Sequence, residues 1–266
     1  MIQSGHYSAA GNNILLSTQN LSKHFGGLVA VDKLDFEVRL GEIHSIIGPN
    51  GAGKTTVFNM ISGFIHPTTG EIRYAGHSVK DYKPYQLVEL GMARTFQRLE
   101  LFGGMTVIQN IMAGFHAKAS SGIFSAGLYL GKVRKEERGI REKAMEILEF
   151  IGLQEKRDRV AVELPFGEQK ILELGRALAT SPKLLLLDEP AAGLNERETL
   201  GMMGLINQSR KRGITVLLIE HDVKMVINIS DWITVLNFGK KIAEGTPNEV
   251  RRHPAVIEAY LGKEEV

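Results

Sequence analysis

A glycine-rich segment of the chain has the residue types and the spacing that bind phosphate. Residues 48–55 read GPNGAGKT and satisfy the pattern G-x-x-x-x-G-K-[ST], with a strand pattern before them and a helix pattern after them. The glycines let backbone N–H groups turn inward around phosphate oxygens, and the start of the helix adds a positive end. We expect Lys54 to neutralise the β- and γ-phosphates, Thr55 to bind Mg²⁺ and Thr56 to reach the α-phosphate. The nucleotide-binding residues predicted here are Asn50, Gly51, Ala52, Gly53, Lys54, Thr55 and Thr56.

Two carboxylates follow an apolar run far downstream. Leu184–Leu187 has the length of a buried strand, and Asp188 and Glu189 come directly after it. Because α/β sheets bind ligands at the carboxyl ends of their strands, the pair is expected at the same edge as the phosphate loop. Asp188 suits contact with Mg²⁺, directly or through water, and Glu189 suits polarising the water that attacks the γ-phosphate. Without the phosphate loop, the pair would more simply be a solvated turn.

Three further side chains are weaker candidates when each is taken alone. His221 follows the apolar run Ile214–Ile219 and is placed to contact the γ-phosphate and hold the water, although a lone histidine is usually structural. Gln97, in the segment RTFQ, is by default an exposed amide. Phe25 either stacks on an adenine face or belongs to the core, and the residues around it leave both possibilities open.

Composition narrows the class of protein. The chain has 266 residues, a net charge of +2 and no cysteine, so disulfides and thiolate metal sites are excluded and nothing indicates nucleic-acid binding. Its longest apolar runs are the length of strands, too short to cross a bilayer. Residues 1–13 lack the features of a secretory signal, and we expect them to form a flexible extension.

Hydrophobic periodicity predicts an α/β architecture with a helical insert. Apolar alternation or continuous apolar runs predict strands at Ile14–Thr18, Lys33–Val38, Glu42–Ile47, Leu184–Leu187 and Ile214–Ile219, and hairpins at 71–79 and 232–244. Helices are expected at Lys54–Ile61, at Lys135–Ile151 and in the amphipathic segment after Pro165. From about residue 94 to residue 164 the pattern is mainly helical.

Taken in order, these motifs resemble the nucleotide-binding subunit of ABC transporters. The resemblance rests on Phe25, 48–55, Gln97, 164–169, 184–189, 193–195 and His221. Within that superfamily, several segments are similar to the ATP-binding subunits of branched-chain amino acid importers. These are FGGLVAVD (25–32), ARTFQ (93–97), LFGGMTVIQN (101–110), DEPAAGLN (188–195), IEHDVKMVINISD (219–231) and EGTPNEVRRHPAVIEAYLG (244–262).

The resemblance implies a single domain over 14–262 and a specific assembly. Its P-loop core would carry an N-terminal antiparallel β subdomain and an inserted helical subdomain, giving a catalytic lobe at 14–93 and 166–262 and a helical lobe at 94–165. Two such subunits, identical or related, would sandwich two ATP molecules, each with Mg²⁺, on the inner face of the cell membrane. Polytopic permease subunits would be the membrane partners, with no role for nucleic acid.

The resemblance also assigns roles to residues outside the phosphate loop. Gln97 would contact the metal and pass motion to the membrane partner, while the turn 164–169 of one subunit would face the γ-phosphate held by the other. The residues carried over for this second contact are Pro165, Gly167, Glu168, Gln169 and Asn195. Many ABC subunits have Asp at the position of Asn195, but asparagine there is part of the branched-chain pattern.

Pro165 departs from the family turn Leu-Ser-x-Gly-x-Gln, because it stands where the family has serine. Proline supplies neither the hydroxyl nor the backbone N–H of serine, although it suits the start of a helix. Losing one charge-assisted hydrogen bond to phosphate would weaken the composite site by about 1.5–3 kcal/mol. The alternative is that Pro165 shapes the turn at no functional cost.

Other functions agree less well with the sequence. The alternative that the transporter carries urea, other amino acids or lipopolysaccharide is left open, because the ATPase subunit does not touch the cargo. An ABC-type ATPase acting on DNA or ribosomes should show a long heptad insertion or tandem cassettes, and the chain has neither. A small GTPase should carry an Asn-Lys-x-Asp loop to read guanine, and nothing here resembles one.

Overall fold

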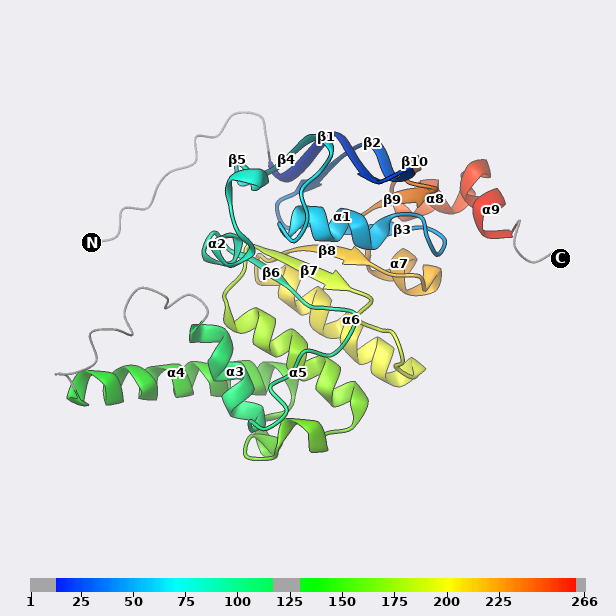
Figure 1. The fold of residues 1–266 in the computed structure, drawn as a ribbon. Helices are drawn as coiled ribbons and strands as arrows, with labels where there is room; N and C mark the ends of the chain where they lie inside the picture. The colour runs from blue at the N-terminus through cyan, green and yellow to red at the C-terminus, as the bar shows by residue number, and fades with distance from the viewer. Residues whose placement is uncertain (1–12, 117–129, 262–266) are drawn as a thin grey trace.

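The computed structural model describes residues 13–116 and 130–261, and these form stacked layers around two sheets. An antiparallel sheet covers one side of helix α1, and a mainly parallel sheet lies on its other side (Figure 1). Further helices cover the opposite face of the parallel sheet. The prediction of a flexible extension at 1–13 lies outside the described residues except for Asn13. No helix in the described ranges is long and apolar enough to cross a membrane.

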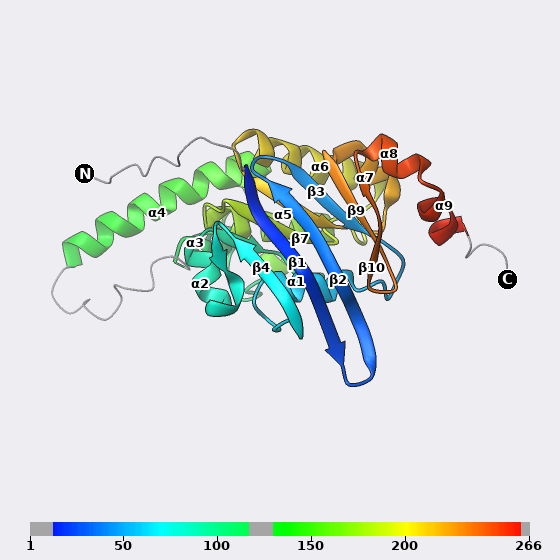
Figure 2. The same ribbon diagram turned by 90° about the horizontal axis from the view of Figure 1, so that it is seen from above.

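The antiparallel sheet consists of four strands in the order β2-β1-β4-β5. Its strands are β1 (Ile14–Phe25), β2 (Leu28–Arg39), β4 (Thr69–Tyr74) and β5 (His77–Ser78). β1 and β2 form a long hairpin that pairs Phe25 with Leu28 and Ile14 with Arg39, as the view from above shows (Figure 2). Both strands are longer than the alternation predicts, because cross-strand pairing carries polar residues such as Gln19 into the sheet.

The second sheet has the order β10-β9-β3-β8-β7-β6. Its strands are β3 (Ile43–Ile47), β6 (Met92–Arg94), β7 (Leu184–Asp188), β8 (Thr215–Ile219), β9 (Trp232–Asn237) and β10 (Lys240–Gly245). Every residue of β3, β7 and β8 is buried, which confirms the prediction that the apolar runs are central strands. Since β3, β7 and β8 are parallel, their carboxyl ends meet at one edge, where Asp188 pairs with Ile219.

Helix α1 (Lys54–Ile61) has the predicted bounds and joins the two sheets. Its Val57, Phe58 and Ile61 are buried in a core shared with both sheets. On the opposite face of the parallel sheet, α6 (Glu196–Lys211) and α7 (Val223–Ile229) share a second core with β7 and β8. The remaining helices near these layers are α2 (Pro84–Glu89), α8 (Pro247–Arg252) and α9 (Pro254–Leu261), with a 3₁₀ turn at Val79–Asp81.

The helices α3 (Val107–His116), α4 (Leu130–Ile151) and α5 (Phe166–Ala179) pack together below the parallel sheet (Figure 1). The helix predicted at Lys135–Ile151 is confirmed and begins earlier. Most described residues between 94 and 164 are helical, as predicted, but residues 95–106 form turns and irregular chain. Short 3₁₀ turns at Gln154–Lys156 and Ala161–Glu163 lead into α5.

Gly114 lets α3 lie directly against α5. A Cβ built on Gly114 would lie 2.4 Å from the carbonyl oxygen of Arg176 and 2.8 Å from the Cβ of Ala179. We predict that Gly114→Ala lowers the free energy of unfolding by about 1–3 kcal/mol, because the clash is with backbone that cannot move independently. Denaturant unfolding measures this loss.

Gly139 supplies the matched control for Gly114. It lies in α4, and a Cβ built on it meets no atom within 4 Å. Gly139→Ala should therefore leave stability unchanged or raise it by up to about 1 kcal/mol, the difference in helix propensity. Equal stabilities for the two variants would contradict the proposed close packing of α3 on α5.

Candidate functional site

The loop between β3 and α1 frames a cavity of about 470 Å³. Two of its glycines are required by close approach of other backbone: a Cβ on Gly48 would lie 2.1 Å from the oxygen of Leu236, and one on Gly53 would lie 2.4 Å from the oxygen of Ala30. The loop is thus seated tightly on the two sheets. The cavity is lined by Phe25, Leu28, Val29, Ala30, Asn50, Gly51, Ala52, Gly53, Lys54, Thr55, Thr56, Gln97, Glu189 and Phe238.

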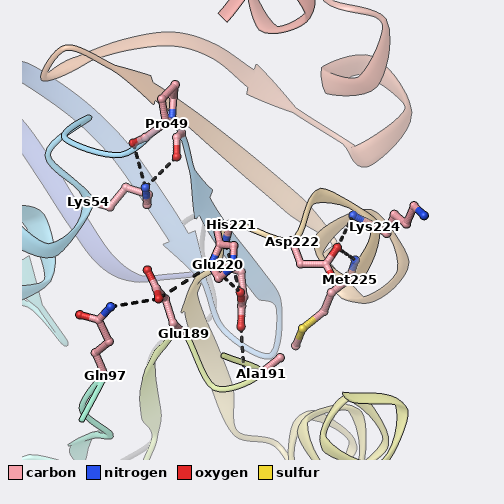
Figure 3. Close-up of polar contacts among 11 residues, drawn as sticks. Pro49, Lys54, Gln97, Glu189, Ala191, Glu220, His221, Asp222, Lys224 and Met225 are labelled. Carbon is pink, nitrogen blue, oxygen red and sulfur yellow. Dashed lines mark hydrogen bonds and ion pairs between the residues drawn. The ribbon is translucent and has the colours of Figure 1, made fainter. Parts of the chain in front are cut away.

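Lys54 directly follows this loop. Its ammonium donates hydrogen bonds to the carbonyl oxygens of Gly48, at 2.7 Å, and Pro49, at 3.0 Å, so the side chain folds back across the loop (Figure 3). Lys54 is the first residue of α1, and Thr55 and Thr56 follow it on the cavity wall. A cation and a helix start therefore converge on the same space, which is the electrostatic setting that phosphate groups prefer.

Gln97 and Glu189 meet on the cavity wall although 92 positions separate them in sequence. The Gln97 amide nitrogen donates a hydrogen bond to Glu189 Oε2 at 3.1 Å (Figure 3). The backbone of Glu189 has a φ of +48°, a left-handed conformation that residues other than glycine rarely adopt. The hydrogen bond from its N–H to the oxygen of Ile219, at 2.9 Å, helps to hold that conformation. Such local strain is concentrated at functional sites.

His221 approaches the same carboxylate from the end of β8. Its Nδ1 lies 3.8 Å from Glu189 Oε2 and 3.7 Å from Glu220 Oε2 (Figure 3). The side chain is 58% exposed, so the ring is free to receive a ligand from solvent. His221 is not among the residues that line the cavity, and it therefore lies beside the site rather than within it.

Glu220 is a buried carboxylate that the sequence reasoning missed. It accepts hydrogen bonds from the N–H groups of Ala191, at 2.9 Å, and His221, at 3.1 Å. Burial raises the pKa of the Glu220 carboxyl, and these N–H donors oppose that rise. The carboxylate thereby ties the loop after Glu189 to the segment that carries His221 (Figure 3). In the sequence, its place between an apolar strand and a polar turn was the only signal.

Asp188 is not among the residues that line the cavity, and its side chain forms a buried ion pair. Its Oδ2 accepts a hydrogen bond from Nη2 of Arg94 at 3.0 Å, and both side chains are almost fully buried. Burial raises the pKa of the Asp188 carboxyl, while the charge of Arg94 lowers it. The structure thus separates the two adjacent acids: Glu189 lines the cavity and Asp188 lies behind it. Arg94 lies in the segment ARTFQ, but nothing in that segment indicates its pairing with Asp188.

Phe25 lies on the cavity wall with 49% of its surface exposed, so the alternative of a core aromatic is wrong. The ammonium of Lys23 lies 5.1 Å from the centre of the ring. Leu28 and Phe238, also exposed, add apolar surface to the cavity lining. An aromatic wall suits a planar base.

The turn at the start of α5 does not line this cavity. Pro165 is the N-cap of the helix and its side chain makes no capping hydrogen bond. Glu168 is paired with Lys156, at 2.5 Å, and the Gln169 amide donates to the oxygen of Leu164 at 2.8 Å. The structure therefore keeps these residues apart from the phosphate loop of the same chain.

Gly167 and Asn195 meet through Glu198 rather than through the cavity. Asn195 caps α6, accepting from the N–H of Glu198, while its own N–H donates to the Glu198 carboxylate. A Cβ on Gly167 would lie 2.5 Å from Oε1 of Glu198, so this glycine gives the turn room against α6. The turn at the start of α5 therefore lies against the start of α6.

Comparison with known proteins identifies the family. Residues 31–192 match the family described as ABC transporter, and residues 240–266 match the family described as branched-chain amino acid ATP-binding cassette transporter. The chain is 45% identical over 250 residues to the high-affinity branched-chain amino acid transport ATP-binding protein LivG of Salmonella typhimurium, covering 94% of this chain and 98% of LivG. It is 43% identical over 251 residues to BraF of Pseudomonas aeruginosa, which has the same description, with the same coverage.

Solved structures agree with this assignment. A nucleotide-free ATP-binding cassette from an ABC transporter is 36% identical, with a TM-score of 0.81 over 94% of this chain and 100% of that one. The ADP conformation of such a cassette is also 36% identical, with a TM-score of 0.82 over 94% and 99%. These likenesses cover both sheets and the helical layer, and they confirm the predicted fold class, a P-loop core with an antiparallel β subdomain and an inserted helical subdomain. The chain therefore belongs to the ABC transporter family and is an ATP-hydrolysing subunit of a transporter.

Proposed function

We propose that the chain binds ATP with Mg²⁺ and hydrolyses it to power the import of branched-chain amino acids. The observation that carries the proposal is the contact between Gln97 and Glu189 on the wall of the phosphate-loop cavity. The cargo follows from the similarity to LivG and BraF, whose names describe branched-chain amino acid transport. Cargo itself would not contact this chain.

Each part of the nucleotide has a matching part of the cavity. The loop N–H groups and Lys54 would hold the phosphates, and Phe25 would stack on the adenine. Glu189 would take a proton from the attacking water, while His221 at the same carboxylate would orient that water. The hydrogen bond from Gln97 would hold this carboxylate in place before the water arrives.

The donors near the loop suit Mg²⁺ only when a nucleotide is also present. Thr55 and Gln97 line the cavity with oxygen atoms, and Asp188 lies behind it. In the described part of the chain, no three His, Cys, Asp or Glu side chains gather closely enough to hold a metal ion alone. Mg²⁺ is usually bound by one or two protein groups together with substrate phosphates, which is the arrangement these residues offer. When bound, it would neutralise the charge on the phosphates.

A second ATPase subunit would complete each site. The turn at Pro165 and the α6 start at Asn195 lie against each other and do not line the chain's own cavity, so they are available to a nucleotide held by another copy or by a related subunit. Permease subunits would supply the membrane-spanning part, and the ATPase would lie on the cytoplasmic face of the membrane beneath them. ATP would close the dimer and hydrolysis would open it.

Glu189→Gln tests the assigned base. The amide keeps the size of the side chain but cannot accept a proton, so turnover should fall by about 10²–10⁴-fold. ATP binding should persist, and the variant should accumulate as a nucleotide-bound dimer, seen by size-exclusion chromatography with light scattering. Glu149→Gln, on the exposed face of α4, is the control and should behave as the wild type. Normal turnover by Glu189→Gln would show that Glu189 is not the base.

Phe25→Ala tests the adenine-stacking role. Loss of the ring should weaken ATP binding roughly tenfold, the scale of one base stacked on an aromatic side chain. Binding of inorganic tripolyphosphate should not change, because that ligand has no base. Phe25→Trp should retain ATP affinity. An equal loss for both ligands would mean that Phe25 shapes the loop instead of contacting the base.

Pro165→Ser tests whether the turn weakens the composite site. Serine restores a hydroxyl and a backbone N–H, so ATPase turnover in the assembled transporter should rise by roughly tenfold. Pro165→Ala restores only the N–H and should give a smaller increase. Steady-state phosphate release measures both variants. No change, or a decrease, with Pro165→Ser would favour the alternative that proline only shapes the turn.

A further inference from the structure

Arg94 connects three separate parts of the nucleotide site. It ends the edge strand β6, where it is paired in register with Leu186 of β7. Its Nη2 donates to Asp188 Oδ2 at 3.0 Å. Its Nη1 donates to Asn59 Oδ1, at 2.8 Å, and to Ser62 Oγ, at 2.7 Å, both at the end of α1, the helix that begins at Lys54.

Three phenylalanine rings enclose the same guanidinium. Its central carbon lies 5.7 Å from the ring centre of Phe58, 5.6 Å from that of Phe64 and 5.0 Å from that of Phe96. Phe64 and Phe96 also meet each other edge to face at 5.7 Å. Because Phe96 directly precedes Gln97, the rings anchor the start of the segment 97–102, called the Gln97 segment below, to the end of α1.

The fork of hydrogen bonds fixes one orientation of Asp188. The carboxylate is 3% exposed and needs an opposite charge to remain ionised at that depth. Arg94 occupies its Oδ2, and the planar guanidinium is itself held by Asn59, Ser62 and the rings. A lysine would keep the charge but would lose the planar fork and most of the ring stacking. Arg94 does not line the cavity, so its influence on a bound ligand must pass through Asp188 and Gln97.

We propose that Arg94 is a positioning residue that fixes Asp188 and the Gln97 segment against α1 and thereby sets the affinity of the site for Mg²⁺. This inference rests on the proposed function, in which Gln97 lines the cavity that would hold Mg–ATP and Asp188 lies behind that cavity. Groups that orient metal-contacting side chains typically change metal affinity by 10–100-fold when they are removed. The role differs from simple packing, because only the metal-dependent part of nucleotide binding should change.

Calorimetry on the full chain separates the metal-dependent part of ATP binding from the metal-independent part. ATP is titrated at a series of Mg²⁺ concentrations and in excess EDTA. Arg94→Gln should raise the Mg²⁺ concentration for half-maximal ATP binding by about tenfold or more. ATP affinity in EDTA should change by less than about twofold, because the phosphate loop and Phe25 stay in place. Arg94→Lys should show a smaller shift, since the ion pair persists without the fork.

Two further variants keep the test decisive. Asn59→Ala removes one hydrogen-bond acceptor of Arg94 and leaves the charge of Arg94 in place. It should therefore raise the Mg²⁺ concentration for half-maximal ATP binding by less than Arg94→Gln does. This variant provides the test if Arg94→Gln fails to fold. Arg73→Gln removes a half-exposed arginine that is paired with Glu71 on the antiparallel sheet, and it should match the wild type.

Two results would overturn the inference about Arg94 alone, and a third would overturn the proposed function as well. Unchanged Mg²⁺ dependence in Arg94→Gln, or in Asn59→Ala where Arg94→Gln does not fold, would show that Arg94 only packs. An equal loss of ATP affinity with Mg²⁺ and with EDTA would show a general structural role. Absence of Mg²⁺-dependent ATP binding in the wild-type chain would instead overturn the proposed function, and with it this inference.

Discussion

Parallel pairing of three fully buried strands is the constraint on which the site depends. β3, β8 and β7 lie side by side in one direction, so the phosphate loop after β3, Glu189 after β7 and His221 after β8 emerge at one edge. Continuous burial on both faces fixes that register, because shifting any of the strands would expose leucine and isoleucine side chains. The chemistry is thus positioned by apolar residues that never touch a ligand.

The parts of the site that the sequence could predict are those specified locally. The spacing of the phosphate loop, the helix after it and the apolar runs each depend on neighbouring residues, and α1 and β7 lie where the pattern places them. The sequence leaves open whether Phe25 belongs to the core or to the binding site, because its exposure depends on where the β1–β2 hairpin meets the loop after β3. Only the fold places that end of the hairpin on the cavity wall.

The parts that could not be predicted depend on contacts between distant segments. The pairing of Arg94 with Asp188 requires that β6 lie beside β7, and a three-residue edge strand carries almost no periodic signal. Glu220 is likewise recognisable only once the loop at Ala191 is seen to fold over it. Asp188 lies in the buried ion pair while Glu189 lines the cavity, and between them the chain leaves β7 through the left-handed backbone of Glu189. No sequence pattern shows that turn of the chain.

Helix α5 joins the two surfaces that a nucleotide would contact from opposite sides. It begins at the turn of Pro165, and further along it three charged residues at spacings of three contact the Gln97 segment. Lys170 donates to the oxygen of Gln97 at 3.3 Å, and Glu173 accepts from the N–H of Glu100 at 3.4 Å. Arg176 stacks on Phe102 at 5.1 Å.

Because residues three apart share one helix face, these contacts hold the irregular segment 97–102 along the length of α5. Lys170 and Glu173 are almost fully buried, and charges at that depth must keep their partners. A rigid displacement of α5 would therefore carry Gln97 with it. The turn at Pro165, which we propose faces a second subunit, and the amide that contacts Glu189 are consequently parts of one mechanical unit.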